Sequence, residues 1–433
     1  MTTTNLRDTY GTIDMEKQLH ISDIVQEYIS GDWGEDSNPD NSLVKVACVR
    51  GADINDVNGS SFKDIPVRYI TSSSLSKKGL KEGNIVIEKS GGAPTQSTGR
   101  VAYISKECIM EHPLIVCSNF CAAFSVKPEW DAQYIFYYLQ YFYNTGVFFN
   151  FEGKTSGLHN LDIEHAFASI PIKRIDIDDQ RHIASVLSNL DRKIALNRQI
   201  NTNLEALARQ LYDYWFVQFD FPDANGKPYK SSGGKMTYNE KLKRHIPDGW
   251  EDGRLADIAN ITMGQSPDGR SYNKEGKGII FYQGCTDFGE RFPEVRQYTT
   301  EPSRYAKKGD ILMSVRAPVG ALNIANNDCC IGRGLAAINS KLGSMTHLYY
   351  VMLSFKEMFD RMSDVGTTFG SITKDELYGL PVVKPDGNII KKYEKKCKPI
   401  CEQQMILGAE ISSLTKQRDE LLPLLMNGQI TVE

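Results

Sequence analysis

Two stretches of the sequence combine glycine with side chains that bind nucleic acids. The first reads EKSGGAPTQSTGR over residues 88–100, and the second reads MGQSPDGRSYN over residues 263–273. Glycine lets the backbone approach a phosphate group, Gln and Arg can make paired hydrogen bonds to a base edge, and Ser or Thr can serve either role. The positions that could contact nucleic acid in these stretches are Lys89, Ser90, Gly91, Gly92, Thr95, Gln96, Thr98, Arg100, Gln265, Ser266, Arg270, Tyr272 and Asn273.

Two further arginines lie in short glycine-containing segments of the second half of the chain. Arg316 belongs to SVRAPVG, and Arg333 belongs to IGRGLA. A solvated turn is the simplest interpretation of any one of these loops taken alone. The loop sequences alone therefore do not distinguish a binding surface from a solvated turn, and the arrangement of the loops in the fold has to be considered.

Catalytic residues do not form a recognisable pattern. Asp268 with Glu275 and Lys277 resembles the acidic and lysine residues of a nuclease, but these residues lie in a Gly-rich loop with poor strand character. The sequence NPDN at 38–41 lacks the second proline and the aromatic residue with which an adenine methyltransferase stacks on a flipped base. A GxxxxGK[ST] phosphate loop is also absent from the sequence. We therefore predict no catalytic residue in this chain.

The cysteines and histidines do not predict a metal site. A structural zinc site needs four clustered Cys or His ligands, whereas the chain has only two isolated CxxxC pairs, Cys117/Cys121 and Cys397/Cys401. None of the seven histidines belongs to an HExxH motif. We interpret the paired cysteines as small buried apolar residues. Nine scattered cysteines indicate reduced thiols in the cytosol and not a disulfide framework.

Length and charge restrict the class of protein. The chain has 433 residues, which predicts two or three domains, and no segment approaches the roughly 18 apolar residues of a membrane span. The first residues lack the features of a secretory signal, so we expect a cytoplasmic protein. The net charge of −4 argues weakly against an independent nucleic-acid-binding protein. If the chain binds DNA, a more basic partner must supply much of the phosphate attraction.

The sequence repeats one plan twice. LKEGNIVIEKSGGAP at 80–94 resembles AKKGDILMSVRAPVG at 306–320, and an aromatic helical pattern at 132–144 recurs at 346–359. Each pattern is followed by a Gly/Thr/Ser loop and a short run that contains Pro171 in the first copy and Pro381 in the second. Such internal similarity predicts two globular domains of the same fold.

A long heptad helix closes each copy. Apolar residues at alternating spacings of four and three predict a helix–helix seam, with polar exceptions such as Asn197 and Arg418. Because the patterns share one register, we expect the helices to pair as an antiparallel intramolecular coiled coil that spaces the domains by about 50 Å. Pro399 predicts that the second helix begins or kinks there. The predicted apolar seam consists of Ile183, Leu187, Leu190, Ile194, Leu204, Leu211, Ile400, Leu407, Ile411, Leu414 and Leu421.

The predicted fold class is α+β, with two similar globular domains separated by two long antiparallel helices. A segment rich in Gly, Pro, Lys and Ser connects the two copies. The predicted organisation is a globular domain at 1–175, a central helical spacer at 176–218, a connector at 219–248, a second globular domain at 249–385 and a C-terminal helical spacer at 386–433.

The chain resembles, over essentially its whole length, the specificity subunit of type I restriction-modification systems. In the first half the resemblance rests on IEKSGGAPTQSTGRVAYI and LNRQINTNLEALARQLYDYWFVQFDFP, the latter similar to the family's central helical region. In the second half it rests on HIPDGWEDGRLADIA, YQGCTDFG and GDILMSVRAPVGALNIA. The first domain lacks the IPxGW start found in the second, so its N-terminal boundary stays open.

The resemblance implies a non-catalytic DNA-recognition subunit. Each globular domain would be a target-recognition domain for one half of a bipartite, asymmetric double-stranded DNA site. The helices would set the spacer and dock two modification (methyltransferase) subunits that methylate adenine with S-adenosylmethionine. Restriction subunits, which are ATP-dependent motor nucleases, would complete the complex. S-adenosylmethionine, ATP and Mg are thus expected on partner subunits, and no cofactor is expected in this chain.

Two alternatives to this function stay open from sequence alone. Two similar domains on a coiled coil could form a bivalent protein-binding scaffold, and a single-chain nuclease is a weaker possibility. Convergence of basic residues on one concave face of each domain would favour DNA recognition, whereas their scatter would favour the scaffold. The residues to compare are Lys89, Arg100, Arg270, Arg316 and Arg333.

Overall fold

The computed structural model describes residues 18–91, 96–155, 158–364 and 370–432. The chain divides into two compact units, Met1–Leu196 with Ser412–Glu433 and Asn197–Ile411. Each unit contains one globular domain and parts of two long helices, α7 (Ile177–Tyr212) and α11 (Gly387–Met426). In the described part of the chain, no helix has the length and apolar character needed to cross a membrane.

The first globular domain is built on two sheets. The main sheet has the order β2-β9-β5-β7 with antiparallel neighbours, and the smaller sheet has the order β4-β3-β8, in which β3 and β8 are parallel. The aromatic helix α5 (Ala132–Asn144) packs in one core with the main sheet. The strands of these sheets are β2 (Val25–Ser30), β3 (Val44–Val49), β4 (Val67–Ile70), β5 (Ile85–Glu88), β7 (Val101–Tyr103), β8 (Ile115–Cys117) and β9 (Cys121–Val126).

The second globular domain repeats this arrangement. Its main sheet has the order β16-β24-β21-β22, again with antiparallel neighbours, and helix α9 (Met345–Asp364) shares its core. Its other sheet has the order β17-β19-β18-β23-β20 and contains the parallel pair β18 and β23. The strands are β16 (Ala259–Met263), β17 (Tyr272–Asn273), β18 (Ile279–Tyr282), β19 (Tyr298–Thr299), β20 (Tyr305–Ala306), β21 (Ile311–Ser314), β22 (Leu322–Ile324), β23 (Cys329–Ile331) and β24 (Leu335–Ser340).

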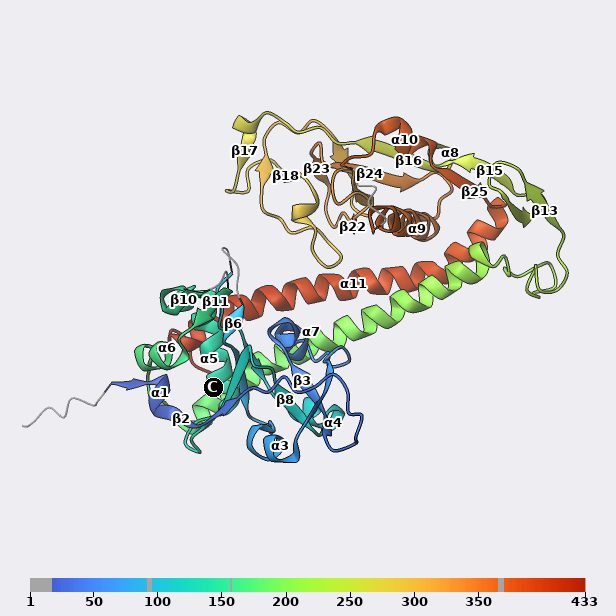
Figure 1. The fold of residues 1–433 in the computed structure, drawn as a ribbon. Helices are drawn as coiled ribbons and strands as arrows, with labels where there is room; N and C mark the ends of the chain where they lie inside the picture. Colours follow the sequence, from blue (N-terminus) through green and yellow to red (C-terminus); the bar gives the residue numbers. More distant parts are fainter. Residues whose placement is uncertain (1–17, 92–95, 156–157, 365–369, 433) are drawn as a thin grey trace, which may run out of the picture. The chain divides into compact units, whose positions relative to one another are not determined.

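The matching strand orders confirm the prediction of two similar α+β domains (Figure 1). A short antiparallel pair also closes each domain, β1 with β12 in the first and β15 with β25 in the second. The remaining elements are β1 (Leu19–His20), α1 (Ile21–Ile24), α2 (Ile54–Asn58), α3 (Ser72–Lys78), β6 (Ser90–Gly91), α4 (Lys106–Glu111), β10 (Glu152–Thr155), β11 (Leu158–Leu161), α6 (Ile163–Ser169), β12 (Pro171–Ile172), β13 (Met236–Asn239), β14 (Arg244–Pro247), β15 (Glu251–Arg254), α8 (Leu255–Ile258), α10 (Lys374–Gly379) and β25 (Pro381–Lys384).

Helices α7 and α11 pair in an antiparallel direction (Figure 1). In the first unit, Arg418 of α11 contacts Asp191 of α7 at 3.0 Å. In the second unit, Asn197 of α7 contacts Glu410 at 2.9 Å, and Gln404 contacts Glu205 at 2.8 Å. Residue numbers rise along α7 while those of the partners fall along α11. The predicted intramolecular coiled coil is therefore confirmed.

The predicted seam residues face away from solvent. Leu187, Ile194, Leu407 and Ile411 are buried, and the other predicted seam residues are buried or half-buried. α11 begins at Gly387 and continues through Pro399, and Figure 1 shows a change of direction in its first turns. A proline inside a helix removes one backbone donor and crowds the preceding turn, so a bend is the expected response.

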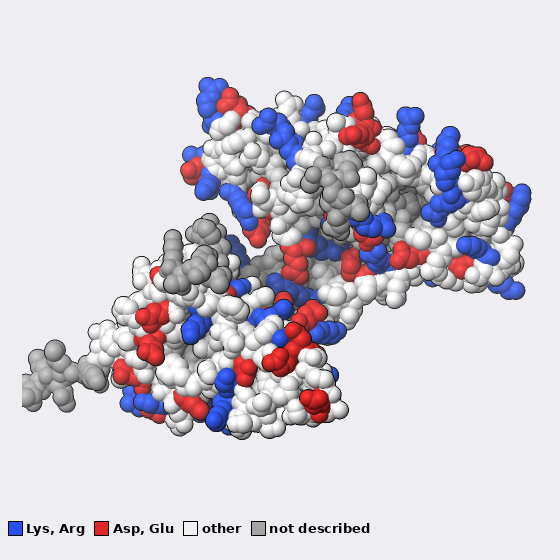
Figure 2. Space-filling view, viewed as in Figure 1, with Lys and Arg blue, Asp and Glu red and all other residues white. Residues whose placement is uncertain are grey.

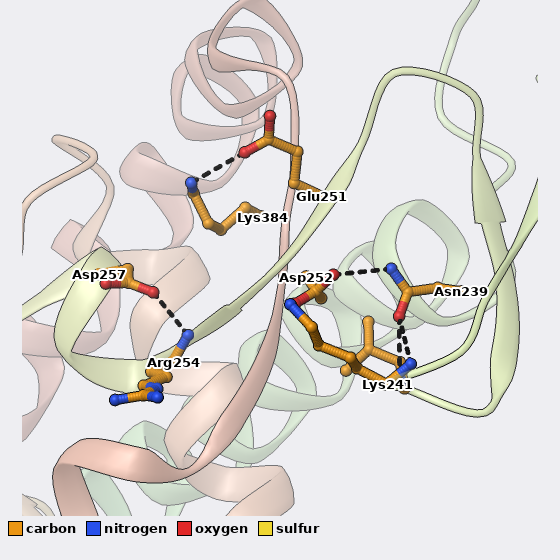
Figure 3. Close-up of polar contacts among 8 residues, drawn as sticks. Asn239, Lys241, Glu251, Asp252, Arg254, Asp257 and Lys384 are labelled. Atoms are coloured by element: carbon orange, nitrogen blue, oxygen red, sulfur yellow. Dashed lines mark hydrogen bonds and ion pairs between the residues drawn. The ribbon is translucent and has the colours of Figure 1, made fainter.

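The connector is ordered by aromatic packing and by polar contacts. Phe221 stacks on Tyr229 at 4.7 Å between ring centroids and on Trp250 at 5.0 Å. Asp252 of β15 accepts hydrogen bonds from Asn239 at 3.0 Å and from a second connector side chain, Lys241, at 2.9 Å (Figure 3). These contacts attach the β13–β14 hairpin of the connector to the first strand of the second domain.

A buried histidine in the second unit predicts acid sensitivity. His347 packs against Phe216, with 4.6 Å between ring centroids, and burial lowers the pKa of its imidazole to about 3. Because the unfolded chain takes up a proton near pH 6.5 while the folded chain does not, stability falls as the pH drops from 6.5 toward 3. We expect this group to reduce the free energy of unfolding by about 2 kcal/mol between pH 7.5 and pH 5. Urea unfolding of the wild type and His347→Gln at both pH values tests this, and equal pH dependence of the two proteins would contradict it.

Candidate nucleic-acid interface

In the second domain, four loops meet where the strands of the main sheet end. Gly264, just after β16, donates its backbone N–H to the carbonyl of Leu335 at 2.9 Å, and Val315, just after β21, donates to Gly334 at 2.9 Å. Gly332 donates to Tyr282, the last residue of β18, at 2.8 Å. We call the loops 264–270, 283–287, 315–317 and 332–334 the second loop cluster. The antiparallel pairing of β24 with both neighbours brings these loops together.

The second loop cluster carries exposed amide and guanidinium groups. Gln265, Gln283, Arg316 and Arg333 are exposed. Ser266 lies beside Arg333, because its hydroxyl accepts the backbone N–H of Arg333 at 3.2 Å. Guanidinium and carboxamide groups are the side chains that make paired hydrogen bonds to guanine and adenine, and they also bind phosphate oxygens. The cluster can therefore supply hydrogen-bond donors to a groove of duplex DNA.

The first domain places an equivalent set of loops at the same edge of its main sheet. Asp32, after β2, donates its backbone N–H to Cys117 at 2.7 Å, and Lys89, after β5, donates to Phe120 at 2.8 Å. Ser118 donates to Val49, the last residue of β3, at 2.9 Å. The bonds from Lys89 and Ser118 repeat those from Val315 and Gly332 in the second domain. The bond from Asp32 repeats one that Gln265 donates to the carbonyl of Ile331 at 3.0 Å. We call the loops 31–35, 50–53, 89–91 and 118–120 the first loop cluster.

The side chains of the first loop cluster differ from those of the second. Lys89 and Asn119 are exposed, and the Phe120 side chain is 55% exposed. Partial burial opposes ionisation of Asp32, but hydrogen bonds from Ser74 and Gly34, with Lys78 at 3.5 Å, outweigh it and lower the pKa of the Asp32 carboxyl. The two clusters thus share a backbone framework and carry different chemical groups.

Close backbone approach fixes the framework in both domains. A Cβ atom added to Gly31 would lie 1.9 Å from the carbonyl oxygen of Ser118, and one added to Gly264 would lie 2.2 Å from that of Gly332. These distances leave no room for any side chain. Glycine is therefore required where β2 and β16 leave their sheets.

The structure separates the sequence-predicted residues of the first domain. Lys89 and Gln96 are exposed, whereas the Ser90 hydroxyl donates to Asn160 at 2.5 Å. Thr98 is fully buried. Gly91 lies in the short strand β6, and Gly92 and Thr95 lie outside the described residues.

Arg100 is directed into the first domain and not toward solvent. Its guanidinium donates two hydrogen bonds, at 2.7 and 2.9 Å, to the buried Glu88 carboxylate, which raises the pKa of Arg100. Satisfying a buried carboxylate is a structural role, because removal of one member of such a pair leaves the other charge uncompensated. Among the basic residues predicted for this domain, only Lys89 belongs to the first loop cluster.

In the second domain, the structure brings Gln265, Ser266, Arg316 and Arg333 together. The other predicted residues, Arg270 at the end of the 264–270 loop and Tyr272 and Asn273 in β17, have local partners. Arg270 pairs with Asp268 at 2.8 Å, the Tyr272 hydroxyl donates to the carbonyl of Pro267 at 3.1 Å, and Asn273 donates to the carbonyl of Lys277 at 2.9 Å.

Sequence reasoning missed Asn119 and Gln283. Each lies at the end of a strand of the smaller sheet, which the sequence pattern did not join to the main sheet. The only feature of the sequence that could have indicated Gln283 is its place directly after the strand sequence IIFY.

Catalytic and metal-binding groups do not gather at either cluster in the part of the chain that the structure describes. Asp268 pairs with Arg270, which lowers the pKa of the Asp268 carboxyl. No group of three or more His, Cys, Asp or Glu residues among the described residues could hold a metal ion. Basic and acidic side chains are interspersed over the face shown in Figure 2. The arrangement therefore suits hydrogen bonding to a ligand more than attraction by a single large basic surface.

Comparison with known proteins places this arrangement in a family. The sequence matches the family model of the type I restriction modification DNA specificity domain twice, over residues 54–206 and 247–394. It is 30% identical over 315 residues to a putative type I restriction enzyme MjaX specificity subunit of Methanocaldococcus jannaschii, covering 71% of this chain and 70% of that protein.

Two more distant relatives match nearly the whole chain. The type I restriction enzyme MjaIX specificity subunit of the same organism is 24% identical over 424 residues, covering 93% of this chain and 92% of that protein. The crystal structure of a type I restriction-modification system S subunit from M. genitalium shares the fold, with a TM-score of 0.56 and 16% identity over 94% of this chain and 95% of that chain.

Proposed function

The chain belongs to the type I restriction modification DNA specificity family, and from this membership we propose that its two loop clusters each read one half of a bipartite, asymmetric DNA site. The observation that carries the proposal is the recurrence of one backbone framework at the same sheet edge in both domains. Side chains of different chemistry on one framework suit two half-sites of different sequence. The coiled coil would set the number of base pairs between the half-sites.

We further propose that the chemistry belongs to partner subunits. S-adenosylmethionine, ATP and Mg would be bound by modification and restriction subunits, while this chain supplies sequence recognition. The interspersed surface charges support this division, because phosphate attraction dominates DNA affinity and would need basic residues from a partner.

An apolar stripe on α7 and on the π-helical turn that follows it, Asp213–Val217, supports docking of a modification subunit in the second unit. Ile200, Leu207 and Tyr214 follow one another at heptad spacing and are 38%, 46% and 37% exposed. Leu207, Leu211 and Tyr214 line a shallow groove of about 420 Å³. Apolar side chains at seven-residue spacing on the outside of a coiled coil suit contact with a further helix. We propose that a helix of the modification subunit occupies this stripe.

Selection from a random DNA pool tests the proposed function. The full chain, alone and mixed with the modification subunit, is incubated with random duplexes at low salt, and the retained DNA is sequenced. We expect a split motif with a fixed gap, enriched strongly only when the modification subunit is present. No enriched motif under these conditions would refute DNA reading and favour the bivalent scaffold.

A further inference from the structure

The two globular domains use equivalent tyrosines to contact the coiled coil. Tyr137 is the sixth residue of α5, which begins at Ala132, and Tyr350 is the sixth residue of α9, which begins at Met345. Both side chains are 2% exposed. Each hydroxyl donates to a carboxylate of α7, although the two carboxylates lie at different heights on the helix.

In the first unit, the tyrosine completes a three-residue polar cluster. The Tyr137 hydroxyl donates to Oδ2 of Asp191 at 2.6 Å, and Arg418 of α11 donates to Oδ1 of the same carboxylate at 3.0 Å. Burial and the neighbouring carboxylate raise the pKa of Tyr137, so its hydroxyl is a proton donor at neutral pH. One carboxylate thus joins the globular domain to both helices.

In the second unit, the same role falls to a different set of residues. The Tyr350 hydroxyl donates to Oε1 of Glu205 at 3.0 Å, and Gln404 of α11 donates to Oε2 at 2.8 Å. Arg291 of the second domain lies 3.6 Å from Glu205 and donates to Gln404 at 3.2 Å. This carboxylate also joins a globular domain to both helices. We call the two clusters, Tyr137–Asp191–Arg418 and Tyr350–Glu205–Gln404–Arg291, the carboxylate clamps.

Directional bonds of this kind fix an angle that apolar packing leaves adjustable. Apolar contacts are non-directional, so they restrict the angle between a domain and a helix less narrowly than hydrogen bonds of fixed geometry do. Hydrogen bonds to an ionised carboxylate are short, strong and directional, and loss of one leaves the others unbalanced in a partly buried site. Each clamp therefore fixes the orientation of its domain on the coiled coil.

We propose that the carboxylate clamps determine how strictly the protein selects the gap between the two half-sites. This inference rests on the proposed function. Adding one base pair to the gap lengthens the DNA by about 3.4 Å and rotates one half-site by about 34° relative to the other. Rejecting such a site requires domains that cannot reorient on their helices. The clamp residues act through domain position, so they are positioning residues and touch no base.

Gap-variant duplexes test the proposal. The full chain with its modification subunit is titrated with duplexes that carry the selected half-sites at the selected gap and at one base pair more or less. The variants are Tyr137→Phe and Tyr350→Phe. Matched controls are Tyr134→Phe and Tyr349→Phe, whose hydroxyls make no hydrogen bond to a described residue.

We expect each clamp variant to reduce the preference for the correct gap about tenfold, the factor that a hydrogen bond to a charged group contributes. Affinity for a duplex with one half-site should stay the same, and so should the behaviour of both controls. A variant that only destabilises the protein would lower the active fraction equally for every gap. Gln404→Met, which leaves both tyrosines in place, provides a second route to the same measurement in the second unit.

Each outcome has a definite meaning. An unchanged gap preference in Tyr137→Phe, Tyr350→Phe and Gln404→Met, with a split motif selected by the wild type, would overturn the clamp proposal alone. Absence of a split motif in the wild type would instead overturn the proposed function. A non-additive effect of Tyr350→Phe combined with Glu205→Met would support the clamp, because each change removes one partner of the same hydrogen bond.

Discussion

Replacing Arg316 and Arg333 together with alanine is expected to erase one half-site from the selected DNA motif and to leave the other intact. Both arginines are exposed, and both lie in the second loop cluster where β21 ends and β24 begins. An arginine that makes paired hydrogen bonds to a guanine contributes about 1–3 kcal/mol of discrimination. Loss of two such contacts should therefore weaken binding of the affected half-site about 100-fold.

The measurement is sequencing of retained DNA together with the salt dependence of affinity for one fixed duplex. Base contacts predict loss of specific positions from the motif. Phosphate contacts predict uniform weakening of all sequences, with a smaller slope of affinity against salt. Arg254→Ala is the matched control, because Arg254 is an exposed arginine of the same unit that ends β15 and lies outside the second loop cluster, beside Asp257 (Figure 3). An unchanged motif and an unchanged salt slope in the double variant would remove the second loop cluster from the interface.

The same reasoning assigns the other half-site. Lys89 and Asn119 occupy the first loop cluster, and their exposed side chains replace the guanidinium groups of the second. The double variant Lys89→Ala, Asn119→Ala should affect only the half-site that Arg316 and Arg333 do not read. The two double variants thus serve as controls for each other.

The architecture could be predicted because it depends on periodic signals. A helix buries one face only if its apolar residues recur at heptad spacing, and the seam that contains Leu187 and Leu407 has this spacing. Both residues are buried. The same order of strand, aromatic helix and proline-containing run occurs twice in the sequence, and this repeat predicted two domains of the same fold. These features depend on residue spacing along the chain, which a sequence displays directly.

The individual site residues could not be predicted in the same way. Arg100 looks like an ideal DNA contact in a Gly-rich loop, yet its partner Glu88 lies on the neighbouring strand, and only the pairing of β5 with β7 reveals it. Asn119 and Gln283 reach the candidate interface from the smaller sheet, through backbone contacts between the two sheets. Such contacts are set by loop geometry, for which the sequence carries no periodic signal.

Replacing Gly31 or Gly264 with alanine is expected to destabilise the corresponding unit by about 3 kcal/mol, the upper range for overpacking a site that cannot relax. The added Cβ would meet backbone atoms on more than one side. At Gly31 the carbonyl oxygens of Ser118 and Cys121 would lie 1.9 and 2.9 Å away, and at Gly264 those of Gly332 and Leu335 would lie 2.2 and 2.8 Å away. To remove this overlap, the loop 118–120 in the first domain or the loop 332–334 in the second domain would have to move away from its sheet. The backbone hydrogen bonds that hold the corresponding loop cluster together would then be lost.

Urea unfolding followed by hydrogen exchange of the intact chain separates the two units. Gly31→Ala should increase exchange in β9, and Gly264→Ala should increase exchange in β24, each without effect on the other domain. Gly269→Ala is the control in the same loop as Gly264, because its added Cβ meets no atom within 4 Å. Full stability and a complete split motif in both variants would show that the close approach at the end of β2 and β16 is dispensable. A selective loss of one half-site from each would instead tie the shared backbone framework directly to DNA recognition.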